Sequence, residues 1–63
     1  MINELRNLLK ENYKNEDIDF YEGVIDLVGG NEEHTADIID FIKTESPTTS
    51  ELLGYCVYLH RGY

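Results

Sequence analysis

Apolar residues recur at helical spacing in four segments of the chain, and residues that favour turns separate these segments. Recurrence at i, i+3, i+4 and i+7 is typical of an amphipathic helix with one face in a core. We therefore predict helices over residues 4–14, 18–28, 32–44 and 49–61. The connections of three to four residues between them favour antiparallel neighbours. The predicted fold is all-α, a compact bundle of four short antiparallel helices that forms a single helical domain over residues 1–63.

Residues with capping side chains stand where the helices are expected to start. Asn3 and Asp17 carry oxygens that can accept hydrogen bonds from the first N–H groups of the helices after them. Thr48 and Glu51 have the spacing of a capping box, in which each side chain bonds the backbone N–H of the other residue. Gly29–Gly30 follows the second helix, and a glycine there adopts a positive φ without steric cost.

The apolar positions also predict the core. We expect Leu8, Ile25, Ile38 and Leu52, one from each helix, to be nearly inaccessible to solvent. The second helix has the widest apolar arc, which combines two adjacent rows: Ile18, Tyr21, Ile25 and Val28, and Phe20, Val24 and Leu27. Gly23 lowers the helix propensity of this segment, so we expect it to mark a close contact between helices.

The charge of the chain is concentrated in one segment. The formal net charge is −8, and the stretch from Asn15 to Asp40 contains nine acidic residues and no lysine or arginine. The acids are Glu16, Asp17, Asp19, Glu22, Asp26, Glu32, Glu33, Asp37 and Asp40. A protein that binds the phosphate backbone directly needs a positive footprint. Direct binding of nucleic acid is therefore excluded.

Helical periodicity sorts six of these acids into two ridges. The first ridge is Asp19, Glu22 and Asp26, and the second ridge is Glu33, Asp37 and Asp40. Carboxylates one turn apart are separated by about 5–6 Å, close to the spacing of phosphates along a strand. The ridges predict a non-enzymatic interaction module that binds and modulates a basic protein, such as a nucleic-acid-handling enzyme, by mimicking nucleic-acid charge. The simpler interpretation is a solvated surface that keeps a small protein soluble.

A second interpretation is a structural or regulatory homo-oligomer with a passive acidic surface. The face of helix 49–61 that lies opposite its core row is unusually apolar for solvent, with Gly54, Val57, Tyr58 and Arg61. Tyrosine and arginine are enriched in the residues that dominate interfaces. A chain of 63 residues has a small core and gains stability from burying further surface in a homodimer.

Metal sites and catalysis receive little support. Asn15, Asp17, Asp19 and Asp26 have calcium-loop spacing, but Phe20 occupies the position that needs a sharply turning glycine. His34 and His60 are too few for zinc, which takes about four ligands. Cys56 and His60 share one helix face, yet Cys56 lies on the core row, where a thiol is inert. We predict no catalytic residue, no metal and no cofactor, and hence no enzyme.

The remaining features concern the compartment. Cys56 is the single cysteine, which fits a reducing environment, and the polar residues from Asn3 onward do not resemble a signal peptide. The apolar run Leu52–Leu59 is much shorter than the roughly 20 residues of a membrane span. We expect a soluble cytoplasmic protein that does not enter the membrane.

Overall fold

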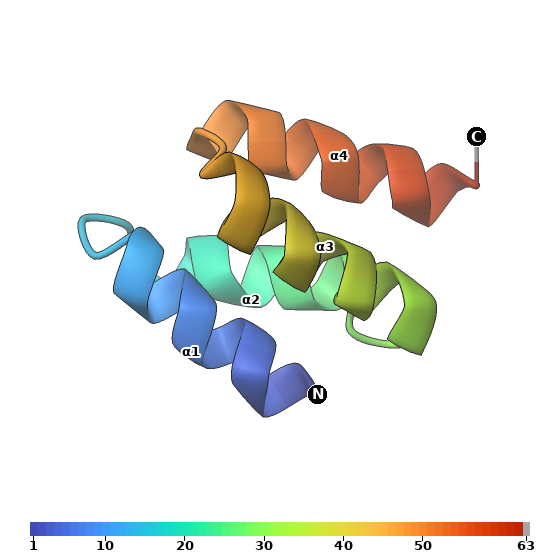
Figure 1. Ribbon diagram of the computed structural model, residues 1–63, viewed down its shortest axis with the longest axis horizontal. Coiled ribbons are helices and arrows are strands. Elements are labelled where there is room, and N and C mark those ends of the chain that lie inside the picture. Colours follow the sequence, from blue (N-terminus) through green and yellow to red (C-terminus); the bar gives the residue numbers. More distant parts are fainter. Residues whose placement is uncertain (63) are drawn as a thin grey trace.

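The computed structural model describes residues 1–62, and these form four α-helices and no strand. The helices are α1 (Ile2–Asn12), α2 (Ile18–Val28), α3 (Glu32–Glu45) and α4 (Thr49–Arg61) (Figure 1). The prediction of an all-α bundle of four short helices is confirmed. The bounds of α2 and α4 match the sequence prediction, and α3 is one residue longer than predicted. Both bounds of α1 were predicted wrongly, since the helix starts and ends two residues earlier than the predicted range 4–14.

The start of α1 differs from the prediction. Met1, and not Asn3, occupies the N-cap position, and the N–H of Leu5 donates to the Met1 carbonyl at 3.2 Å. Starting the helix at Ile2 brings that side chain against Gly29, which follows α2. The helix thus begins before Asn3, and no side-chain cap starts it.

Side-chain caps begin the other three helices of the described chain. In each, the cap oxygen accepts a hydrogen bond from the N–H three residues later: Asp17 from Phe20, Asn31 from His34, and Thr48 from Glu51. The carboxylate of Glu51 accepts in return from the N–H of Thr48 at 2.9 Å, which completes the predicted capping box. Polar residues at these caps therefore fix where α2, α3 and α4 begin.

Glycine is required after α2 for a different reason from the one predicted. Gly29 has φ −66° and ψ −21°, which is ordinary right-handed backbone. A Cβ at Gly29 would lie 2.5 Å from the Ile25 carbonyl oxygen and 2.7 Å from Cδ1 of Ile2. A Cβ at Gly23 would have none of the described atoms within 4 Å, so the expected close contact at Gly23 is wrong. Gly29 is where the N-terminal end of α1 closely approaches the end of α2.

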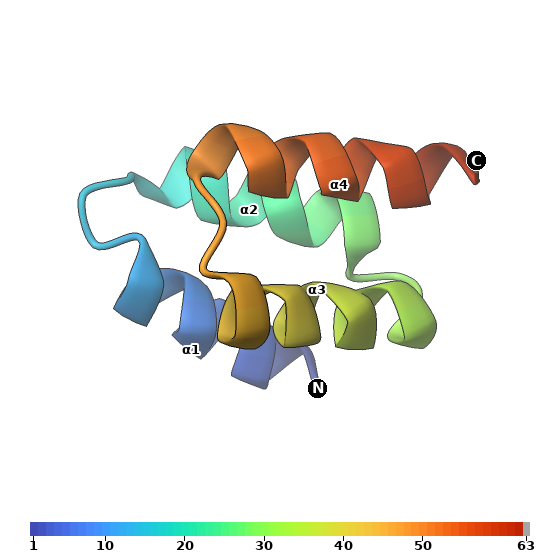
Figure 2. The same cartoon turned by 45° about the horizontal axis from the view of Figure 1, so that its top comes forward.

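The four helices form two layers, with α2 and α4 in one and α1 and α3 in the other (Figure 2). The pairs of helices with Cα atoms within 8 Å of each other are α1 with α2, α1 with α3, α2 with α3, α2 with α4, and α3 with α4. Within the described residues, α1 has no Cα atom within 8 Å of α4, because these two helices lie on the long diagonal of the bundle. The helices that carry the two acidic ridges, α2 and α3, are in contact with each other.

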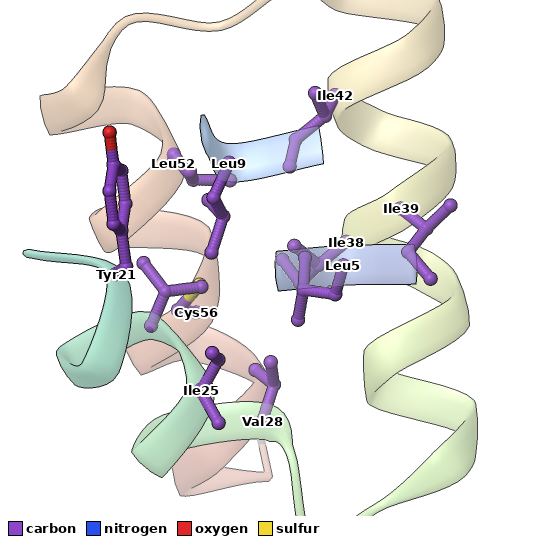
Figure 3. Close-up of a cluster of buried hydrophobic side chains, with 11 residues drawn as sticks. Leu5, Leu9, Tyr21, Ile25, Val28, Ile38, Ile39, Ile42, Leu52 and Cys56 are labelled. Carbon is purple, nitrogen blue, oxygen red and sulfur yellow. The ribbon is translucent and has the colours of Figure 1, made fainter. Parts of the chain in front are cut away.

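The core lies between the layers and receives side chains from all four helices (Figure 3). Its buried members are Leu5, Leu9, Tyr21, Val24, Ile25, Val28, Ile38, Ile39, Ile42, Leu52 and Cys56. The burial of Ile25, Ile38 and Leu52 confirms the prediction for three of the four expected positions.

Two apolar residues are more exposed than their helix rows suggested. Leu8 is only partly buried. The reason is that α1 packs against α2 and α3 but not α4, so only a narrow face of α1 is covered, and Leu5 and Leu9 occupy that face. Ile18 is 66% exposed, since it is the first residue of α2 and extends past the layer that covers the helix. Both predictions of burial were wrong at the edge of the core.

Candidate interaction surfaces

The first ridge is partly neutralised by the protein itself. Asp19 and Asp26 are exposed on α2, whereas Glu22 is half-buried and accepts a hydrogen bond and ion pair from the guanidinium of Arg6 on α1. One base of α1 is therefore paired with one acid of the first ridge. Opposite charges on adjacent helices reduce the negative potential that this side presents to a partner.

The second ridge is more open. Glu33, Asp37 and Asp40 are all exposed on α3, and within residues 1–62 no base forms an ion pair with any of them. Lys43 is the one base within α3, and its ammonium donates to the carboxylate of Glu4 on α1 at 2.9 Å. That hydrogen bond lowers the pKa of Glu4 below its ordinary value and directs the lysine away from the ridge. The carboxylates of the second ridge therefore present their full charge to solvent.

The two ridges lie on α2 and α3, which are consecutive along the chain and in contact with each other. Each ridge is on the side of its helix that faces away from the buried residues. The ridges differ in their pairing, because Glu22 of the first ridge is bound to Arg6 and the second ridge has no ion pair with a described residue. The second ridge is therefore the more exposed of the two acidic surfaces.

The outer face of α4 is exposed as well. Val57 and Tyr58 are 37% and 48% exposed, and they lie opposite Leu52 and Cys56, which are in the core. Gly54 is exposed, and a Cβ placed on it would have none of the described atoms within 4 Å. Arg61 is exposed at the end of the same helix. Sequence periodicity placed all four residues of this face correctly on the outside.

An aromatic row between α3 and α4 was not anticipated. The ring centroids of Phe41 and Tyr55 are 4.9 Å apart at an interplanar angle of 66°, and those of Tyr55 and Tyr58 are 6.1 Å apart at 15°. We call Phe41, Tyr55 and Tyr58 the aromatic row. The spacing of Tyr55 and Tyr58 on one helix was a signal in the sequence, but the contribution of Phe41 depends on the register of α3 against α4.

Two of the residues considered for metal binding make other contacts. The carboxylate of Asp17 caps α2, and His60 places Nδ1 3.1 Å from the carbonyl oxygen of Leu27. Among the described residues, no three histidine, cysteine or acidic side chains are grouped so that they could hold a metal ion. Burial raises the pKa of the Cys56 thiol to about 11, so the nucleophilic thiolate is disfavoured at neutral pH.

The described surface of the bundle offers exposed faces that a partner could contact, and no pocket that could enclose a ligand. No pocket opens anywhere on residues 1–62. Nor does any helix in this part of the chain combine the length and the apolar character that crossing a bilayer requires. The second ridge, the aromatic row and the outer face of α4 are thus the candidate functional surfaces. No family model, curated protein or solved structure matches the chain.

Proposed function

We propose that this protein is a non-enzymatic acidic interaction module that binds and modulates a basic protein partner. The observation that carries the proposal is the exposure of Glu33, Asp37 and Asp40 without an ion-pair partner among residues 1–62. Exposed charges of one sign attract a partner of the opposite sign and speed its association. The net charge of −8 extends that attraction to the whole molecule.

The spacing of the second ridge favours a partner that normally holds nucleic acid. Its carboxylates lie one helical turn apart, about 5–6 Å, which is close to the separation of successive phosphates on one strand. Because the second ridge is a single line of carboxylates along one helix, it imitates a single strand and not a duplex. The partner we expect is a nucleic-acid-handling enzyme with a basic path for one strand, which the ridge would occupy and inhibit.

The test is affinity capture from a lysate of the native host with matched charge reversals. In one variant Glu33, Asp37 and Asp40 are changed to Lys. In the control Glu16, Asp19 and Asp26 are changed to Lys, which alters the net charge equally at exposed positions outside the second ridge. We expect a basic protein to be captured by wild type and control and lost by the first variant.

Salt supplies the second measurement for the captured protein. Exposed charges are screened within roughly 10 Å at 0.1 M salt, so binding should weaken steadily from about 50 to about 500 mM. Far-UV circular dichroism checks that both variants remain folded. A captured protein that is retained by the Glu33, Asp37 and Asp40 variant and at high salt would show that the ridge is only a solubilising surface.

Self-association through α4 is the second candidate function. It is favoured by the exposure of Val57 and Tyr58 beside Gly54, where a second backbone can approach closely. Sedimentation over a wide concentration range compares wild type with a Val57→Asp, Tyr58→Ser double variant. A wild-type protein that is monomeric at every concentration eliminates this candidate. A wild-type dimer and a folded monomeric variant support it.

A further inference from the structure

The aromatic row leads from the edge of the core to solvent. Phe41 and Tyr55 are partly buried and pack against the core, whereas Tyr58 is 48% exposed. The nearly parallel rings of Tyr55 and Tyr58 present an aromatic surface along the side of α4 that faces α3.

The packing of α3 on α4 places one carboxylate of the second ridge beside this surface. The two helices are antiparallel neighbours (Figure 2), and the contact between Phe41 and Tyr55 fixes their register. Asp37 is one turn before Phe41 on the same side of α3, and Tyr58 is one turn after Tyr55 on α4. The chain runs in opposite directions in the two helices. A residue one turn before Phe41 on α3 and a residue one turn after Tyr55 on α4 are therefore at the same height along the helix axes. Asp37 and Tyr58 therefore flank the outer end of the row.

The carboxylate at the inner end has a different role. Glu51 is one turn before Tyr55, but its side chain accepts a hydrogen bond from the N–H of Thr48 in the capping box. Asp37 has no such bond to a described residue, and it is exposed. The acceptor that remains for a ligand is thus next to Tyr58.

We propose that the aromatic row and Asp37 form a binding site for an arginine side chain on a basic protein segment. The proposal rests on the proposed function, because it names the feature of the basic partner that this surface recognises. A guanidinium is planar and weakly hydrated, so it stacks on an aromatic face while its forked N–H groups donate to a carboxylate. A lysine ammonium is compact and strongly hydrated and fits this combination less well.

Charge determines the choice of occupant. The net charge of −8 attracts a basic segment and opposes the approach of a second copy of the same chain. On this register Asp37 of the second ridge is at the level of Tyr58, so a segment with one stacked arginine and further basic residues can contact both the row and the ridge. The second ridge attracts any cationic side chain. The aromatic row makes binding of arginine tighter than binding of lysine.

The test uses two synthetic peptides in place of the partner. One is a short glycine–serine peptide with several arginines, and the other carries lysine at the same positions. Titration at low salt, followed by amide chemical shifts and calorimetry, should show the arginine peptide binding about two- to fivefold more tightly than the lysine peptide. The shifts should centre on Phe41, Tyr55 and Tyr58.

Two variants locate the effect. Tyr58→Leu retains apolar bulk and charge, so it should remove the preference for arginine and leave the affinity for the lysine peptide unchanged. Asp37→Asn should weaken binding of the arginine peptide more than Asp26→Asn does. These last two variants change the net charge equally, but Asp26 lies on the first ridge.

Three other results would refute the arginine site, and each has a different consequence for the proposed function. Equal binding of both peptides, unaffected by Tyr58→Leu, refutes the arginine site and leaves the basic-partner function standing. No binding of either peptide overturns the arginine site and counts against the proposed function as well. A wild-type dimer in sedimentation that Tyr58→Leu dissociates would assign the aromatic row to a second copy.

Discussion

The hydroxyl of Tyr13 donates a hydrogen bond to the carbonyl of Pro47 at 2.6 Å and so joins the end of α1 to the loop between α3 and α4. The hydroxyl of Tyr21 on α2 donates to the carbonyl of Tyr13, also at 2.6 Å. Pro47 is buried, and a buried carbonyl without a partner is costly. Two tyrosines thereby connect three segments at one end of the bundle.

Removing either hydroxyl should destabilise the protein. Tyr13→Phe and Tyr21→Phe each remove a hydrogen bond, and we expect each to lower the free energy of unfolding by about 1 kcal/mol. Urea denaturation of the single and double variants measures both costs and their coupling. Because Tyr13 takes part in both bonds, the two costs should not be additive. Full additivity would show that the bonds act independently.

Adjacent leucines of α1 should differ in their sensitivity to truncation. Leu9 is fully buried, so Leu9→Ala should cost about 2–5 kcal/mol, which on so small a domain comes close to unfolding it. Leu8 is only partly buried, and Leu8→Ala should cost roughly half as much or less. Chemical denaturation compares the two variants directly. An equal cost would contradict the orientation of α1 described above.

Two glycines associated with α2 should respond in opposite directions to alanine. Gly23 has open space around a new Cβ, so Gly23→Ala should stabilise the helix by about 0.5–1 kcal/mol. At Gly29 the same substitution places a Cβ 2.5 Å from a backbone oxygen, and the protein should lose stability. Thermal unfolding of the pair is the measurement. A stabilising Gly29→Ala would show that α1 does not pack as closely on α2 as it does here.

The buried thiol predicts a loss of stability at alkaline pH. Desolvation raises the pKa of Cys56 from an ordinary 9.0 to about 11 in the folded protein. Between these values the unfolded chain loses the thiol proton and the folded chain retains it, so stability is complete below pH 9 and declines toward pH 11. Denaturation across this interval should show a shallower decline for Cys56→Ala than for wild type.

Tyr13 contributes to the same alkaline decline and supplies the control. Desolvation raises the pKa of its hydroxyl above the ordinary 10.0, so its contribution to stability is complete below that pH and declines above it. Both variants should therefore make the loss of stability at alkaline pH smaller. The effect of Tyr13→Phe should appear at a higher pH than the effect of Cys56→Ala. If neither variant alters the slope, other groups cause the alkaline loss.

Local patterns predicted most of the fold because local interactions decide it. Asp17, Asn31 and Thr48 each cap the helix that follows, and such a cap needs only a side chain and an N–H three residues away. The contact of Ile2, the first residue of α1, with Gly29 instead joins residues distant in sequence. The exposure of Leu8 similarly depends on which neighbours α1 has. Neither this contact nor the exposure of Leu8 can be predicted from the spacing of apolar residues within one helix.

The candidate surfaces show the same division. Periodicity correctly put the second ridge and the outer face of α4 on the exterior. It could not show that Arg6 pairs with Glu22, that Lys43 pairs with Glu4, or that Phe41 meets Tyr55. Each of these relations joins two helices and is set by their packing.

The position of the two ion pairs has a consequence for the encounter with a partner. Both pairs, Arg6 with Glu22 and Lys43 with Glu4, involve a residue of α1, whereas the carboxylates of the second ridge on α3 have no ion pair with a described residue. The negative charge is therefore uneven around the bundle, and within a Debye length of about 8–10 Å an uneven field turns an approaching basic protein as well as attracting it. A basic partner would thus meet α3 first, already oriented when contact is made.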